Sequence, residues 1–125
     1  MIDFNNKPVL KFKSAPIEEA ELVIGELLVD NEELIACFTS MREKVIFTNK
    51  RIITLIRVGL GEMDAIDYSI IPYKSIIAFS IETHEGLHSE AEMEIVLSEL
   101  RTIRFELKGD FDIRYLNKII SEQIL

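Results

Sequence analysis

The sequence predicts a mainly β protein: a bent antiparallel sheet or partial barrel of about seven strands, capped by a C-terminal helix, with an additional N-terminal helix. Three observations support this fold class. Short apolar segments are separated by turn residues between positions 34 and 83, period-two alternation runs through residues 92–108, and the last fifteen residues carry a helical apolar stripe. We therefore expect one sheet with a helix at each end.

Residues 1–33 are predicted to form an N-terminal arm and a helix. Pro16 suits the first turn of a helix, and Glu18 and Glu19 suit the positive end of its dipole. Ile24 and Leu28 then lie on one apolar side. Asp30-Asn31 ends this element.

Residues 34–108 are predicted to form the β body. Gly59-Leu60-Gly61 breaks one strand from the next, and Pro72 requires a corner or bulge. In the last two strands, polar side chains alternate with Met93, Ile95 and Leu97 and then with Ile103, Phe105 and Leu107, as in a sheet with one buried face. The predicted strands are residues 34–41, 45–48, 51–58, 65–71, 75–83, 92–98 and 102–108.

Residues 110–125 are predicted to form the C-terminal helix. Asp110 or Asp112 can cap its N-terminus, and an apolar stripe follows from Ile113 to Ile124. This stripe needs a cover, which an open end of a strongly bent sheet supplies. Because no repeat or linker is visible, residues 1–125 are predicted to form a single domain.

Composition excludes several function classes. The chain has 125 residues, a net charge of -8, and no Lys or Arg between Ser14 and Met41, a stretch that carries seven acids. Such a surface repels phosphate backbones, so nucleic acid is not an expected partner. No apolar run is long enough to span a membrane, and the N-terminus lacks signal-peptide features. With the single cysteine, Cys37, predicted to pack as a small apolar side chain, we expect a cytoplasmic protein.

The strand pattern and four blocks of sequence together resemble the bacterial pleckstrin-homology-like (bacterial PH) domains. The blocks occur in the family's order, and they are Phe47-Thr48-Asn49-Lys50-Arg51-Ile52-Ile53, Tyr68-Ser69-Ile70-Ile71-Pro72-Tyr73-Lys74-Ser75-Ile76, Phe79-Ser80-Ile81-Glu82-Thr83 and Ala91-Glu92-Met93-Glu94-Ile95. The departures from the family pattern are in loops, at residues 61–64 and 84–88. The resemblance covers nearly the whole chain and implies a PH-like domain.

The candidate interaction residues lie at two predicted corners of the sheet: Asn49, Lys50, Arg51, Tyr73 and Lys74. Exposed loop residues on a rigid sheet are a common place for binding. The plainer interpretation is structural, with Asn49 shaping a turn, Lys50 and Arg51 solubilising a hairpin tip, and Tyr73 half-buried. No catalytic residue, cofactor or metal site is predicted.

Two alternative functions can be weighed against the residues. His84-Glu85-Gly86-Leu87-His88 matches the H-E-x-x-H pattern of zinc hydrolases, but that pattern needs a helix, and a turn between strands is expected here. A module that binds anionic lipid is the other alternative. The turn where PH domains place their basic residues holds only Arg42 and Lys44, so membrane lipid is not an expected partner.

The sequence therefore favours a non-enzymatic interaction module. Apolar residues on both faces of the predicted strands, together with open sheet edges, favour self-association. The family resemblance implies a cyclic homo-oligomer, with a pentamer favoured, in which a hydrophilic strand-lined surface binds another protein, so far unknown.

Overall fold

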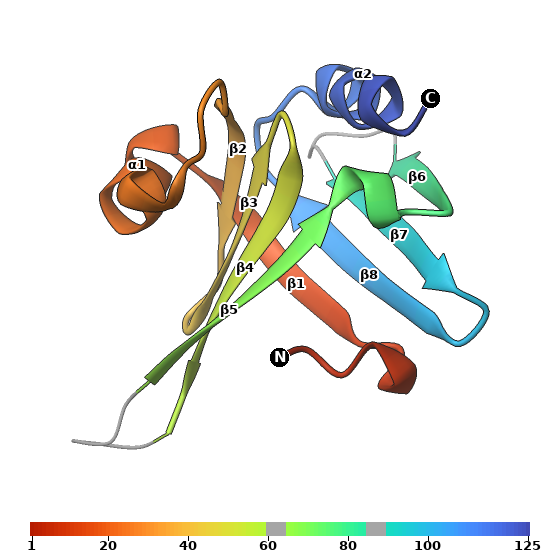
Figure 1. The fold of residues 1–125 in the computed structure, drawn as a ribbon, viewed down its shortest axis with the longest axis horizontal. Coiled ribbons are helices and arrows are strands. Elements are labelled where there is room, and N and C mark those ends of the chain that lie inside the picture. The colour runs from red at the N-terminus through yellow and green to blue at the C-terminus, as the bar shows by residue number, and fades with distance from the viewer. Residues whose placement is uncertain (60–64, 85–89) are drawn as a thin grey trace.

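A computed structural model describes residues 1–59, 65–84 and 90–125 (Figure 1). Its strands are β1 (Val9–Ala15), β2 (Leu34–Thr39), β3 (Glu43–Thr48), β4 (Arg51–Val58), β5 (Ala65–Pro72), β6 (Ala78–His84), β7 (Glu90–Ser98) and β8 (Arg101–Lys108). Its helices are α1 (Ile17–Ile24) and α2 (Ile113–Ile124), with single 3-10 turns η1 (Phe4–Asn6), η2 (Gly25–Leu27) and η4 (Tyr73–Ser75). The predicted fold class is confirmed.

All eight strands of the described residues belong to one curled sheet, in the order β5-β4-β3-β2-β1-β8-β7-β6. Strand β1 joins its two halves, since it pairs antiparallel with β2 through Lys13–Ala15 and parallel with β8 through Val9–Lys13. The two halves diverge from this junction as the arms of a V (Figure 1). The sequence pattern predicts residues 9–15 as part of an N-terminal arm, followed by about seven antiparallel strands. The structure adds β1 as an eighth strand and makes one of the pairings parallel.

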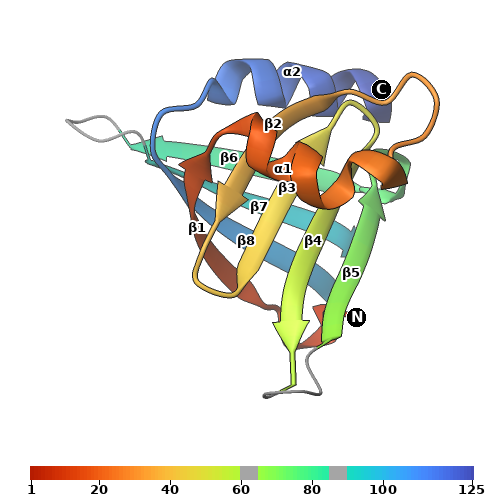
Figure 2. The ribbon, with the colours of Figure 1, turned by 90° about the vertical axis from the view of Figure 1, so that its left-hand side faces the viewer.

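The main core fills the space between the arms of the V. Phe47 is fully buried in this core, and its ring centroid lies 5.8 Å from that of Phe38 and 6.1 Å from that of Phe105, both in edge-to-face geometry. Helix α2 lies across one end of the sheet (Figures 1 and 2), and its Leu116 and Ile120 are buried in this core. The amphipathic C-terminal helix therefore covers an open end of the sheet, as its apolar stripe predicts.

Helix α1 covers part of the opposite, outer face of the sheet (Figure 2). Glu18 and Glu19 occupy its first turn, as predicted, whereas Pro16 is its N-cap residue, one position before the first turn in which it was expected. Its Ala20 and Ile24 are buried in a second, smaller apolar cluster whose sheet residues are Cys37 of β2, Ile46 of β3, and Ile53 and Leu55 of β4. Strands β2, β3 and β4 have apolar side chains on both faces because the main core covers one face and α1 covers the other.

Candidate interaction surfaces

The hairpin between β3 and β4 is held by a buried ion pair. Arg51, at the start of β4, donates from Nε to Glu32 Oε2 at 2.8 Å and from Nη2 to Glu32 Oε1 at 2.9 Å. The same Nη2 donates to the carbonyl oxygen of Leu27 at 2.9 Å. The side chain of Glu32 is fully buried and that of Arg51 is 17% exposed. This paired geometry ties the loop after α1 to the hairpin.

The environment of Glu32 keeps its carboxylate charged. Burial opposes ionisation, but hydrogen bonds from Arg51, from the Thr48 hydroxyl and from the backbone N–H of Val29 outweigh it, together with the charge of Arg51. The pKa of the Glu32 carboxyl is therefore below its usual value.

Asn49 and Thr48 shape the turn of the same hairpin. The Thr48 hydroxyl accepts from the backbone N–H groups of Lys50 and Arg51, each at 3.0 Å. The Asn49 side chain accepts from the backbone N–H of Glu33 at 2.8 Å and donates to the carbonyl oxygen of Asn31 at 3.0 Å. Both side chains are therefore engaged in fixing backbone.

Tyr73 connects the second predicted corner to this hairpin. Its ring is fully buried, and its hydroxyl donates to the carbonyl oxygen of Thr48 at 2.6 Å. Burial, assisted by the charge of Glu32, raises the pKa of the phenol far above its ordinary value. The backbone N–H of Tyr73 also donates to the carbonyl oxygen of Lys50, at 3.2 Å.

The structure thus brings the five candidate residues together, but in two roles. Arg51 is bonded to Glu32, Tyr73 to Thr48, and Asn49 to the backbone of Asn31 and Glu33. Lys50 and Lys74 are exposed. Only these two lysines present their side chains to solvent as an interaction residue would. Glu32 is the residue that sequence reasoning missed, because it lies within an acidic run that reads as a solvated surface.

A different surface carries the exposed apolar side chains. The outer face of β5 presents Ile66, Tyr68 and Ile70, which are 43%, 42% and 47% exposed. Each lies opposite a β4 residue in register, and the β4 partners of Tyr68 and Ile70 are Leu55 and Ile53, which α1 buries. The apolar outer face of the sheet therefore continues one strand beyond the edge of the helix.

Helix α1 and turn η2 extend this surface. Leu22 is 87% exposed, Leu27 is 48% exposed and Val23 is 41% exposed. Together with Tyr68 and Ile70 they line a shallow groove, and its polar lining includes Glu21 and Glu26. We call the set Leu22, Val23, Leu27, Ile66, Tyr68 and Ile70 the α1–β5 surface.

The remaining sequence candidates have structural roles or lie outside the described residues. Arg42 of the β2–β3 turn donates to the carbonyl oxygen of Gly59 at 3.2 Å, and Nζ of Lys44, which the structure places in β3, lies 3.4 Å from Glu19 Oε2, so both cations are engaged. Cys37 is buried, as expected. His84 ends β6, whereas Glu85 and His88 of the H-E-x-x-H pattern lie outside the described residues. No helix in the described part of the chain has the length and apolar character needed to cross a membrane.

A comparison with protein families decides where the chain belongs. The model of the family described as bacterial PH domain matches residues 3–124. This chain is a member of the bacterial PH domain family. The match indicates no enzymatic family.

Relatives and solved structures agree with this assignment. The domain is 30% identical over 100 residues to the uncharacterized protein YjqA of Bacillus subtilis, a match that covers 78% of this chain and 79% of YjqA. A DUF1696 family protein with a pleckstrin-homology domain from Shewanella loihica superposes with a TM-score of 0.70 at 28% identity, over 93% of this chain and 99% of that one. A pleckstrin homology domain from Shewanella amazonensis gives a TM-score of 0.58 at 28% identity, over 89% and 90% of the two chains.

Proposed function

We propose that this bacterial PH domain is a non-enzymatic interaction module that assembles into a cyclic homo-oligomer, a pentamer being favoured, and binds another protein. The observation that carries the proposal is the α1–β5 surface. Isolated exposed apolar side chains are ordinary, but six that extend from a helix onto the adjacent edge strand form a continuous patch of the kind that proteins use for association.

The arrangement of the sheet favours a second copy of the chain as the occupant of this surface. Among the described strands, β5 and β6 each pair on one side only, which leaves two different open edges. Next to the β6 edge, Ile77 is 66% exposed and Ala78 is also exposed. A contact between unlike edges is head-to-tail, and repetition of a head-to-tail contact closes into a ring when the rotation permits.

The outer face of the other half of the sheet supports the second part of the proposal. In contrast to the α1–β5 surface, it carries mainly charged side chains. They come from four neighbouring strands and are Lys11, Lys13, Glu82, Glu90, Glu92, Glu94, Arg104, Glu106 and Lys108. A hydrophilic surface of this kind, on rigid strands, suits recognition of a protein partner by complementary charge.

Light scattering on a sizing column tests the assembly. We expect the wild-type domain to elute as a discrete oligomer at micromolar concentration, and Leu22→Glu or Ile70→Glu to shift it towards monomer, because each places a charge in the apolar contact. Leu100→Glu is the matched control: Leu100 is 70% exposed but lies in the turn between β7 and β8. A wild-type monomer, or an oligomer that Leu22→Glu and Ile70→Glu leave intact, would contradict the proposal.

A further inference from the structure

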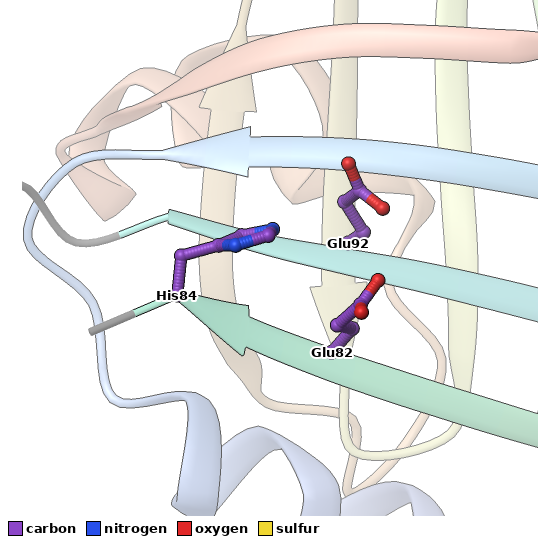
Figure 3. A group of neighbouring side chains, drawn as sticks. All are labelled: Glu82, His84 and Glu92. Atoms are coloured by element: carbon purple, nitrogen blue, oxygen red, sulfur yellow. The ribbon is translucent and has the colours of Figure 1, made fainter.

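Three side chains with atoms of the kind that bind metal ions lie close together at the exposed edge of the charged half of the sheet (Figure 3). Glu82 and His84 are two positions apart on β6 and therefore share a face, and Glu92 lies directly opposite Glu82 on β7. One ligand atom from each side chain lies within 4.8 Å of the other two. Figure 3 shows the imidazole of His84 pointing towards the two carboxylates.

The charge at this cluster is only partly balanced. Glu82 and Glu92 are like charges in directly opposite positions, an arrangement that destabilises a strand pair. Arg104 Nη1 approaches Glu92 Oε2 at 3.6 Å from the β8 side. Within the described residues, no cationic side chain forms an ion pair with Glu82. A bound cation on the β6 side would convert the repulsion between the two glutamates into coordination.

We propose that Glu82, His84 and Glu92 bind a divalent transition-metal ion of the zinc class. An imidazole nitrogen with two carboxylate oxygens suits zinc, whereas magnesium and calcium prefer oxygen ligands alone. Zinc bonds of about 2.0 Å in a tetrahedral shell place ligand atoms about 3.3 Å apart. Glu82 and His84 are exposed and Glu92 is only partly buried, so small rotamer changes can bring the three ligand atoms to that spacing.

This site differs from the one that the H-E-x-x-H pattern suggests. The pattern pairs His84 with His88 and takes Glu85 as a base, whereas the strand register combines His84 with Glu82 and Glu92. The ion would join β6, the edge strand, to β7. Three protein ligands leave a fourth tetrahedral position, open to water or to a donor group on a partner protein.

Titration calorimetry of the chelator-stripped full chain with zinc chloride tests the proposal, with magnesium chloride as the comparison. We expect one zinc ion per chain and no measurable magnesium binding. Glu82→Gln, Glu92→Gln and His84→Ala should each weaken zinc binding at least about tenfold, since loss of even an outer-shell partner costs metal affinity about that factor. Glu94→Gln is the matched control, because Glu94 lies on the same face of β7 but opposite Ser80, and it should change the affinity less than about twofold.

Thermal unfolding supplies a second measurement on the same proteins. Zinc should raise the melting temperature of the wild-type and Glu94→Gln chains more than that of Glu82→Gln, because a ligand stabilises the folded state in proportion to the logarithm of its binding. Circular dichroism checks that each variant is folded. The absence of zinc uptake would overturn the proposal. So would uptake that Glu82→Gln and Glu92→Gln leave intact while His84→Ala or His88→Ala abolishes it.

Discussion

Replacement of Arg51 by alanine should destabilise the domain strongly. Arg51→Ala removes both charge-assisted hydrogen bonds to Glu32 and leaves a fully buried carboxylate. Breaking a buried ion pair by removing one partner costs about 3–5 kcal/mol. Thr48 and the backbone N–H of Val29 still donate to Glu32 in the variant, so we expect about 3 kcal/mol, the lower end of that range.

Such a loss is a large fraction of the stability of a domain of this size. Proteins are typically stable by about 5–15 kcal/mol, and a chain of 125 residues has an unfolding entropy of about 0.26 kcal/mol/K at the midpoint. The melting temperature of Arg51→Ala should therefore fall by about 11 °C. Urea unfolding at pH 7 measures the free energy directly. Lys50→Ala is the control, because Lys50 is the exposed neighbour in the same hairpin, and its effect should be within about 0.5 kcal/mol of zero.

The stability difference between the wild-type domain and Arg51→Ala should depend on pH. The folded-state pKa of Glu32 is lowered from a reference value of 4.5, so its stabilising contribution is fully present above that pH and is lost as the pH falls through the folded-state pKa. In Arg51→Ala, burial acts with weaker opposition and favours the protonated carboxyl, so acidification relieves part of the penalty. The stability difference between the two proteins should therefore be largest at neutral pH and should shrink below about pH 4.5. A difference under about 1 kcal/mol at pH 7, or one that grows on acidification, would refute the reasoning.

Two further predictions concern other buried side chains. Tyr73→Phe removes the hydrogen bond to the carbonyl oxygen of Thr48 and should cost about 1–2 kcal/mol in urea unfolding, with no change in the circular dichroism spectrum; an unchanged unfolding midpoint would contradict it. Cys37 is 2% exposed and burial raises the pKa of its thiol, so a colorimetric thiol reagent should react with it only after denaturation, and rapid labelling of the folded protein would contradict the buried position.

Most of the fold could be predicted because its signals are local. The hairpins from β2 to β5 and from β6 to β8 join strands that are neighbours in sequence, and β4 occupies the very residues, Arg51–Val58, that their pattern predicts. The sequence pattern did not predict strand β1, because the signals for this strand are not local. Leu10 and Phe12 alternate with lysines over only a few positions, and the parallel partner of this segment, β8, is about ninety residues away in sequence. A short-range sequence pattern cannot predict the pairing of two strands so far apart in the chain.

The candidate interaction residues show where local patterns stop. Asn49 is a residue typical of turns, and the structure places it in the turn between β3 and β4. The role of Arg51 depends on Glu32 in the loop after α1, and that of Tyr73 depends on the carbonyl oxygen of Thr48 at the end of β3. A sequence pattern identifies a basic residue at a hairpin but not a buried carboxylate nineteen positions earlier that neutralises it.

Most polar side chains of the β3–β4 hairpin already bond to other parts of the domain, which restricts where the domain can bind. A side chain whose polar atoms are all satisfied by buried partners gains little from a new contact, and moving it would leave the other partner unpaired. We therefore expect binding at the places where secondary structure leaves apolar or charged faces uncovered. Helix α1 covers the outer face as far as β4 and leaves β5 apolar and exposed, whereas the outer face of β6 and β7 keeps its glutamates. On the two proposals above, the apolar outer face at β5 takes a second copy of the chain and the outer face of β6 and β7 takes a metal ion. We therefore expect variants of the α1–β5 surface to change assembly and leave zinc binding unchanged.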